Sequence, residues 1–460
     1  MKLIIKILRR ISMDIAAALV ATFILLVTSV FKGIYLGYPL GLAIILFSAA
    51  AARRGHRVDD IIRMAYRGGR KSFIVVKVFV LIGALIPLWM SAGTVPAIVY
   101  YGIEMIRPNL FILSAFLISC AVSLLIGTAV GTTGVVGAAL MVMARSGGVD
   151  LYAAAGAIIA GAYFGDRCSP VSSGASFIAS ITDTDLYDNV SNMFRTSVVP
   201  LIISSAFYLL VSRGNPLGSE TGSISSMIAD EFDLNLVVLV PAAIIIGFSL
   251  MRINVKTLMG ASIAAALAIS IFIQKETLQS SFKYMIFGFT LDDANVLYGI
   301  IKGGGILPMM KTALVVYLAS SFAGILEGAN LLCGVEKVTS GADTRYKVFK
   351  YELMLSFFTA AVGCSQTFAV MMTKMLNSRS YEKNGLDRSC EAIDLENTAI
   401  MVSPMIPWNI ALLAPMTILG TNAASMPYMI YIYLVPLWNL VYLKLQEKQN
   451  RWYIPQVHVK

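Results

Sequence analysis

The chain has 460 residues, of which 57% are hydrophobic and only 13% charged, and its formal net charge is +10. Soluble domains carry about 25% charged residues, whereas one membrane span needs about 20 apolar residues. This composition excludes a soluble enzyme, a disordered protein and a secreted disulfide scaffold. It also argues against an outer-membrane barrel, whose strands alternate polar and apolar residues. The sequence therefore predicts an all-α polytopic membrane protein.

Apolar stretches recur along the whole chain. The first one is long and a second follows directly, so it predicts a transmembrane helix and not a cleaved signal peptide. We expect about ten to twelve transmembrane helices, with shorter segments that form half-helices or re-entrant hairpins. The long stretches are 13–31, 34–52, 73–90, 110–130, 151–165, 196–211, 234–250, 257–273, 308–326, 354–362 and 426–443, and the short ones are 97–106, 135–144, 171–181 and 410–420.

Basic residues gather in particular segments between the apolar stretches. Residues 1–12 carry four bases and no acid, and the predicted loop 53–71 carries seven bases against two acids. Segment 213–233 instead carries one base against four acids. Because basic loops stay in the cytoplasm, we expect both termini and 53–71 on the cytoplasmic side of the cell membrane, and 213–233 outside. Bases confined to short loops do not indicate nucleic-acid binding.

Three kinds of landmark occur twice in the same order. A glycine and a proline open an apolar run, a glycine with hydroxyl residues interrupts a later run, and a Ser-Pro pair follows a third. Paired breaks at corresponding points of two halves indicate inverted repeats and mark the binding site of a transporter. The landmarks are 91–96 and 302–308, 130–133 and 362–367, and the Ser-Pro pairs 169–170 and 403–404.

The repeats divide the chain into five parts. We expect an N-terminal two-helix segment with its basic loop, a first transport repeat, an acidic external loop with linker helices, a second transport repeat and a cytoplasmic tail. Their bounds are 1–72, 73–212, 213–283, 284–443 and 444–460.

The Ser-Pro breaks have the chemistry of an ion site. Pro170 and Pro404 each remove a backbone donor and disfavour helix at the preceding residue. Freed carbonyls at membrane depth are tolerated only inside protein or beside a water-filled cavity. Such carbonyls, joined by Ser and Thr hydroxyls, suit a sodium ion.

At these residues the sequence resembles the NhaC-type sodium/proton antiporters of the ion transporter superfamily. The resemblance extends from about residue 85 to about residue 440. It implies a secondary active transporter, and not an enzyme, with two inverted repeats that work by alternating access. Sodium and protons would be the transported ions, with no cofactor, and a homodimer in the lipid bilayer is expected because carriers of this superfamily are often dimers. The similar stretches are 93–96, 100–102, 161–170, 184–186, 303–305, 322–327 and 403–409.

The chain departs from that family directly after Pro170. Members usually continue Ser-Asp-Thr-Thr-Asn, whereas this chain has Ser173 in place of the aspartate and Ser176 in place of the asparagine. The missing acid leaves two hypotheses open: sodium/proton exchange, and sodium-coupled transport of a small organic acid or amino acid. An ion channel is the alternative from another class, although paired breaks fit alternating access better. No G-x-x-x-x-G-K-[ST] motif occurs, which argues against an ATP-driven pump.

Asp166 leads the candidate site residues. A carboxylate at membrane depth costs about 2.5–3.5 kcal/mol on insertion scales, which indicates a sodium ligand or a proton carrier. Pairing with Arg167, or capping of a helix, is the structural alternative. A sodium ion would lie at Asp166, Ser172 and Thr133. The other predicted ion- or substrate-binding residues are Ser169, Ser173, Ser176, Thr132, Ser365, Gln366, Thr367, Ser403, Asn409 and Glu327.

Overall fold

The fold is helical, as the composition predicts. Within the described residues of this computed structural model the only β contact is an isolated bridge between Phe289 and Gly303. The described residues are 13–105, 107–170, 172–218, 221–251, 253, 255–291, 297, 301–329, 331 and 342–448.

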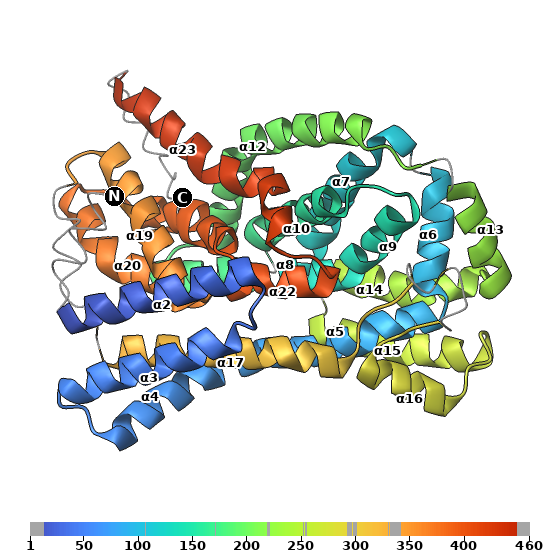
Figure 1. The fold of residues 1–460 in the computed structure, drawn as a ribbon. Coiled ribbons are helices and arrows are strands. Elements are labelled where there is room, and N and C mark those ends of the chain that lie inside the picture. Colours follow the sequence, from blue (N-terminus) through green and yellow to red (C-terminus); the bar gives the residue numbers. More distant parts are fainter. Residues whose placement is uncertain are drawn as a thin grey trace.

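Helices follow one another with short connections, and several are broken into consecutive pieces (Figure 1). Up to residue 214 they are α2 (Met13–Lys32), α3 (Gly37–Arg53), α4 (Val58–Lys71), α5 (Phe73–Ser91), α6 (Thr94–Met105), η1 (Pro108–Leu110), α7 (Phe111–Ile126), α8 (Ala129–Thr132), η2 (Thr133–Gly137), α9 (Ala138–Ser146), α10 (Leu151–Cys168), α11 (Ser173–Thr182) and α12 (Leu186–Gly214). The later ones are α13 (Thr221–Glu231), η3 (Leu236–Leu239), α14 (Val240–Leu250), α15 (Val255–Phe272), α16 (Leu278–Phe287), α17 (Ile306–Gly328), α19 (Arg345–Gly363), α20 (Gln366–Lys383), α21 (Arg388–Leu395), η5 (Glu396–Ile400), η6 (Ser403–Met405), α22 (Ile410–Leu419), η7 (Ala423–Tyr428) and α23 (Ile430–Lys448).

Several described helices have the length and composition of membrane spans. Two more spans arise if each bent helix pair counts as one, with bends of 66° at the α5–α6 junction and 52° between η6 and α22. Four single spans are Pro108–Ile126, Ala129–Ser146, Leu186–Gly214 and Ile306–Gly328, and shorter apolar helices cover Asp14–Val30, Gly37–Arg53, Leu236–Phe248 and Lys256–Phe272.

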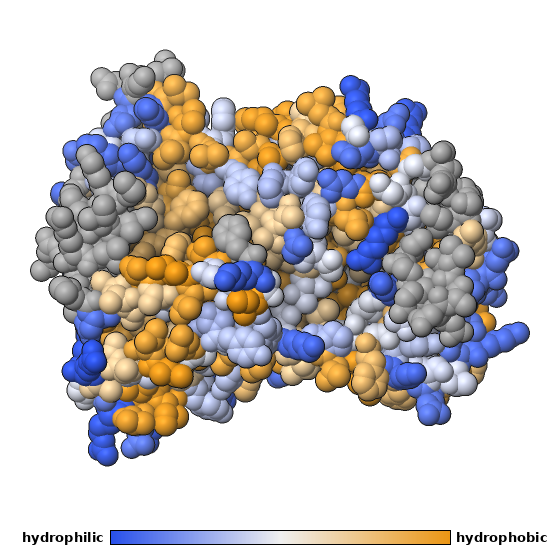
Figure 2. Space-filling view, in the orientation of Figure 1, coloured by the Kyte–Doolittle hydropathy of each residue, from blue (hydrophilic) through white to orange (hydrophobic). Residues whose placement is uncertain are grey.

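Apolar side chains are exposed along the candidate spans. On α12, Val198, Ile202 and Leu210 are 51%, 62% and 66% exposed. Figure 2 shows broad hydrophobic areas on one face of the molecule, with hydrophilic side chains gathered mostly toward its left and right edges. Apolar surface of this extent marks contact with a partner or a membrane, and exposed apolar helix faces are what lipid requires of a spanning helix.

The predicted breaks are present, with one shift in position. The α5–α6 bend lies at Gly93, with φ +76°, and α19 ends at Cys364, with φ +53°. The break predicted at 130–133 lies instead at Gly127, whose φ of +71° closes α7 in the left-handed conformation. Residues 130–133 are helical because α8, the π turn η2 and α9 continue one another. Glycine tolerates positive φ without the Cβ penalty, which explains the shift.

The prediction of a loop over 53–71 is wrong for most of that segment, because Val58–Lys71 forms α4. Figure 1 shows α4 beside α3 and α17 along the lower edge of the molecule. A Cβ atom on Gly68 would lie 2.3 Å from the Ser320 carbonyl oxygen and 2.7 Å from Gly324 Cα. Glycines on both helices thus let the backbones touch. Likewise, the acidic segment 213–233 contains α13.

Candidate functional site

The position of Asp166 follows from close packing of α10 on α7. Cβ atoms on Gly161 and Gly165 would lie 2.4 Å from the Phe116 carbonyl oxygen and 2.2 Å from Leu124 N, so only glycine allows this approach. Spacing of small residues by four places them on one helix face, as in other membrane helix pairs. The last turn of α10, which carries Asp166, is thereby held against the Gly127 break.

In the first half of the chain the break at Gly127 and the Ser-Pro break at 169–170 are in contact. Asp166 Oδ1 accepts a hydrogen bond of 3.2 Å from Ala129 N, the first residue of α8. Ser169 Oγ donates to the Leu124 carbonyl at 2.6 Å, in the last turn of α7. Ser172 caps α11 by accepting from Gly174 N and Ala175 N. Asp166 therefore caps a helix, which is one of the structural alternatives named for this residue in the sequence analysis. Its second carboxylate oxygen is left for other partners.

The second half repeats this arrangement around the Cys364 break. Asn409 Nδ2 donates to the Ala360 carbonyl at 2.9 Å, in the last turn of α19, and its Oδ1 caps α22 at Ala411 N. Ile410 N donates to the Cys364 carbonyl at 2.9 Å. In both halves, then, one residue between the two helices that flank the later break (Ser169 or Asn409) bonds the last turn of the helix that ends at the earlier break.

Arg167 joins the two halves. It is fully buried, and its guanidinium bonds side chains of α12, α23 and η5. It donates to Ser197 Oγ at 2.5 Å and Thr196 Oγ1 at 2.7 Å on α12, to Tyr431 Oη at 3.4 Å on α23, and to Asn397 Oδ1 on η5. None of the described carboxylates forms an ion pair with it.

Glu396 lies beside this network with its carboxylate unpaired. It is 1% exposed, and neither of its oxygens has a hydrogen-bond partner among the described residues. The Arg167–Asn397 bond brings together two adjacent residue pairs, Asp166-Arg167 and Glu396-Asn397. Arg167 Nε also lacks a described partner. Glu396 interacts electrostatically with both Arg167 and Asp166, so the cluster holds two acids and one base, with donor and acceptor atoms left unused inside the protein.

Three of the predicted hydroxyl ligands donate to backbone carbonyls three or four residues before them. Thr132 donates to the Thr128 carbonyl, Thr133 to the Ala129 and Val130 carbonyls, and Ser403 to the Ala399 carbonyl. Each hydroxyl oxygen still has acceptor capacity. Thr133 and Asp166 are close because both contact Ala129.

The remaining predicted residues are spread more widely. Gln366 donates to the Ile400 carbonyl at 3.3 Å, and a Cβ atom on Gly174 would lie 3.6 Å from Ile400 Cδ1. The residues that follow the Cys364 break and those that follow the Pro170 break therefore both border η5. Ser365 is half-buried at the start of α20, and Ser173, Ser176 and Thr367 are exposed. Glu327 is half-buried at the end of α17, and α17 lies beside α3, α4 and α5.

The sequence analysis missed Glu396, Asn397, Thr196, Ser197 and Tyr431. One signal was available, since Asp394 and Glu396 lie only a few residues before the apolar stretch 399–402 and the second Ser-Pro pair. An acid in such a run is a functional candidate by the same cost argument as Asp166. The remaining members are common residue types that only their proximity to Arg167 singles out.

A cavity of about 210 Å³ reaches this network from one side. Its walls include Thr196 and Asn397, which bond Arg167, together with Arg345, Asp394 and Asn439. The buried cluster is therefore next to a polar space large enough for several water molecules or a small solute.

Comparison with known proteins identifies the chain. The model of the Na+/H+ antiporter family matches residues 1–175 and 161–445. This chain belongs to that family. Its NhaC-type membership makes it a multi-pass membrane protein and a secondary transporter, not an enzyme.

Relatives of this chain have different named substrates. The Malate-2H(+)/Na(+)-lactate antiporter of Bacillus subtilis is 27% identical over 86% of this chain and 87% of its own length. The Na(+)/H(+) antiporter NhaC of Alkalihalophilus pseudofirmus is 25% identical over 87% and 88% of the two chains. The arginine/ornithine antiporter ArcD of Halobacterium salinarum is 28% identical over 84% of this chain and 81% of its own length.

Proposed function

We propose that this family member is a sodium/proton antiporter that binds its coupling cation between Asp166 and Glu396. The carrying observation is the Glu396 carboxylate, which is buried with both oxygens unpaired. An uncompensated buried carboxylate costs several kcal/mol, so it needs a proton or a cation. Two carboxylates and one guanidinium leave one negative charge, which a single H+ or Na+ neutralises. Competition of the two ions for this charge is the basis of exchange.

The predicted ligands contribute to this proposal in two ways. Asp166 and Glu396 supply the charge, and Thr133, with Thr132 next to it, offers hydroxyl oxygen close to Asp166. Ser169, Ser172, Ser403 and Asn409 hold the breaks in place, and Ser365, Gln366 and Thr367 lie at the start of α20, directly after the Cys364 break. Ser173 and Ser176 are exposed at α11, and Glu327 lies on α17.

We propose that residues 73–212 and 284–443 are two inverted repeats, with 1–72 before them, 213–283 between them and 444–460 after them. Matching left-handed helix ends at Gly127 and Cys364, each tied to the following break, support this division. Alternating access would then move one repeat relative to the other around the Arg167 cluster. A homodimer stays a prediction, for which crosslinking in native membranes is the measurement.

The full number of spans and their orientation belong to the same proposal. The four shorter apolar helices, added to the four long ones and the two bent pairs, make ten crossings reachable within the described residues, the lower end of the ten to twelve expected. In Figure 1 the start of α2, the α3–α4 turn and the end of α23 lie toward one end of the molecule, and α13 toward the other. This arrangement supports cytoplasmic termini and an external α13. Labelling of single cysteines placed in the α3–α4 turn and in α13 tests it.

The decisive experiment is sodium-dependent dissipation of a pH gradient in proteoliposomes. Wild-type protein should show saturable exchange, whereas Asp166→Asn and Glu396→Gln should lower its rate by at least about tenfold, or about 1.4 kcal/mol. Asp343→Asn, which removes an exposed acid paired with Lys347, is the control. Conduction that does not saturate and cannot drive uphill movement would indicate the channel alternative instead.

A second candidate function is sodium-coupled transport of a small organic acid or amino acid. Two observations favour it: the serine at position 173 and the unused Nε of buried Arg167. Arginine binds carboxylates through a planar fork of donors. Uptake assays with a panel of carboxylates and amino acids, run in the same vesicles, decide between the two functions. Solute-dependent sodium flux would favour this candidate, and a pH response to sodium alone would favour the first.

A further inference from the structure

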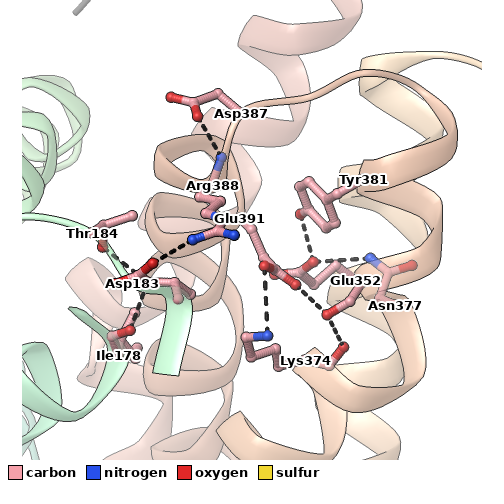
Figure 3. Close-up of polar contacts among 12 residues, drawn as sticks. Ile178, Asp183, Thr184, Glu352, Lys374, Asn377, Tyr381, Asp387, Arg388 and Glu391 are labelled. Carbon is pink, nitrogen blue, oxygen red and sulfur yellow. Dashed lines mark hydrogen bonds and ion pairs between the residues drawn. The ribbon is translucent and has the colours of Figure 1, made fainter. Parts of the chain in front are cut away.

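A second cluster of buried acids lies within the second half of the chain, where α19, α20 and α21 pack together. Glu352 and Tyr381 are 0% and 3% exposed, and Asp394 is 1% exposed. Figure 3 shows Glu352 of this cluster bonded to Tyr381 and Asn377, with Glu391 to its left and Lys374 below. This cluster does not include the residues assigned to the coupling cation.

The hydroxyl of Tyr381 lies between two carboxyl groups. Its Oη is 2.5 Å from Glu352 Oε2 and 2.6 Å from Asp394 Oδ2. Both distances are those of short, charge-assisted O–H···O bonds. A tyrosine hydroxyl carries one hydrogen and can donate one bond. The second short contact therefore needs a second hydrogen, which one of the two carboxyl groups must carry.

Arg345 decides which carboxyl carries that hydrogen. Its Nη1 and Nη2 donate to Asp394 Oδ2 and Oδ1 at 2.5 and 2.6 Å, an ion pair that holds Asp394 ionised. Glu352 has no cation within ion-pair distance among the described residues, and its Oε1 has no described partner. Since an isolated buried carboxylate is costly, the extra hydrogen belongs on Glu352 Oε2.

The other charged groups around Glu352 agree with this assignment. From α20, Lys374 faces Glu391 of α21, with Nζ and Oε2 3.9 Å apart, and Ser378 donates to Glu391 at 2.5 Å. From α19 itself, Arg345 is taken by Asp394. The neutral amide of Asn377 donates to Glu352 Oε2 at 2.9 Å. Each nearby cation thus has another acid as its partner, and the nearest anions disfavour a second negative charge on Glu352.

We propose that Glu352 is a proton-binding site of this carrier, and that Tyr381 and Asp394 connect it to the cavity. In the state described, Glu352 Oε2–H donates to Tyr381 Oη, and Tyr381 Oη–H donates to Asp394 Oδ2. Transfer of both hydrogens along these bonds leaves Glu352 ionised, Tyr381 unchanged and Asp394 protonated. Asp394 lines the cavity, so water there can take the proton. The role of this proton in exchange rests on the proposed function, but the protonation of Glu352 does not.

Infrared difference spectroscopy of the purified protein tests the protonation directly. Wild-type protein should show the carbonyl stretch of a buried protonated acid, and Glu352→Gln should lose that band. Glutamine keeps the shape. Its amide nitrogen in the place of Oε2 can donate to Tyr381 and, if the Asn377 amide turns over, to the Asn377 oxygen, which has no partner among the described residues. The variant is therefore expected to fold. Glu382→Gln, an exposed change next to Tyr381, should leave the band in place. Persistence of the wild-type band in Glu352→Gln would overturn the assignment.

Flux measurements test the pathway. In proteoliposomes, Glu352→Gln and Tyr381→Phe should each slow proton movement by at least about tenfold, since proton transfer through positioned groups contributes about 10²–10⁴-fold. Exchange of labelled cargo for unlabelled cargo, which needs no net proton transfer, should continue in both. Unchanged proton flux in both variants would overturn the pathway. If the wild type moved no protons, the proposed exchange would fail, while the infrared band would still decide the state of Glu352.

Discussion

The two buried polar clusters of this transporter differ in how their charges are compensated. Around Arg167 the base bonds neutral side chains and Glu396 has no described partner, so charges from the two halves of the chain are close without forming an ion pair. Around Asp394 the base and acid form a two-bond ion pair inside one half. A paired charge stabilises its surroundings, whereas an unpaired one is available to a ligand. The cluster around Arg167 is suited to bind a transported ion. The ion pair at Asp394 is suited to hold Tyr381 and the proton-binding Glu352 in a fixed position.

Arg345→Met should have the largest effect on stability. It leaves Asp394 buried without its cation, which typically costs about 3–5 kcal/mol. The free energy of unfolding in detergent, measured by denaturant titration, should fall by that amount. The double variant Arg345→Met with Asp394→Leu should recover much of the loss, because no buried charge remains. Lack of any recovery would show that the pair stabilises through its shape and not its charge.

Arg167→Met should destabilise the protein less than Arg345→Met, by about 1–3 kcal/mol. Its partners have other bonds, since Ser197 also donates to the Met193 carbonyl and Thr196 to the Asn192 carbonyl. Transport should nevertheless be lost, because Asp166 and Glu396 would no longer be held together. The same titration and the pH-gradient assay measure both effects. A loss of stability larger than that of Arg345→Met would contradict the contrast between the clusters.

Glu396→Gln should separate function from stability. Removing a buried charge that has no described partner should leave the free energy of unfolding unchanged or raise it by about 1 kcal/mol. Exchange should fall by at least about tenfold, as stated above. Thermal unfolding and vesicle transport are measured on the same preparation. A marked fall in stability would show that Glu396 has a structural partner.

Ser173→Asp should have the smallest effect on stability, within about 0.5 kcal/mol, because the side chain is exposed at the start of α11. An acid at this position also suits the helix N-terminus. If the serine favours an organic solute, the variant should transport that solute more weakly and exchange sodium for protons faster. Solute-dependent sodium flux beside sodium-dependent pH change gives the readout. Identical fluxes in both proteins would remove Ser173 from the question of selectivity.

Much of the site framework could be predicted because proline and glycine act locally. The Ser-Pro pairs break their helices, and the bend after Ser91 is where the glycine and proline predict it. The shift of one break from 130–133 to Gly127 shows the limit of such patterns, since several glycines there satisfy the same rule. The prediction of a loop over the α4 segment was wrong for another reason. The polar outer face of α4 has the composition of a loop, and only packing on α17 through Gly68 makes it part of the bundle.

The sequence by itself determined that this protein lies in a lipid bilayer, that its fold is helical, and which family it resembles. A 57% hydrophobic content requires lipid, and Pro170 and Pro404 each disfavour a continuous helix at their own positions. Tertiary structure alone decided which polar side chains meet. Arg167 bonds Asn397, which lies 230 residues away in the sequence, and forms no ion pair with the adjacent Asp166. Such pairings depend on which helix faces touch, and no local propensity encodes that, because the same residues with another packing would find other partners.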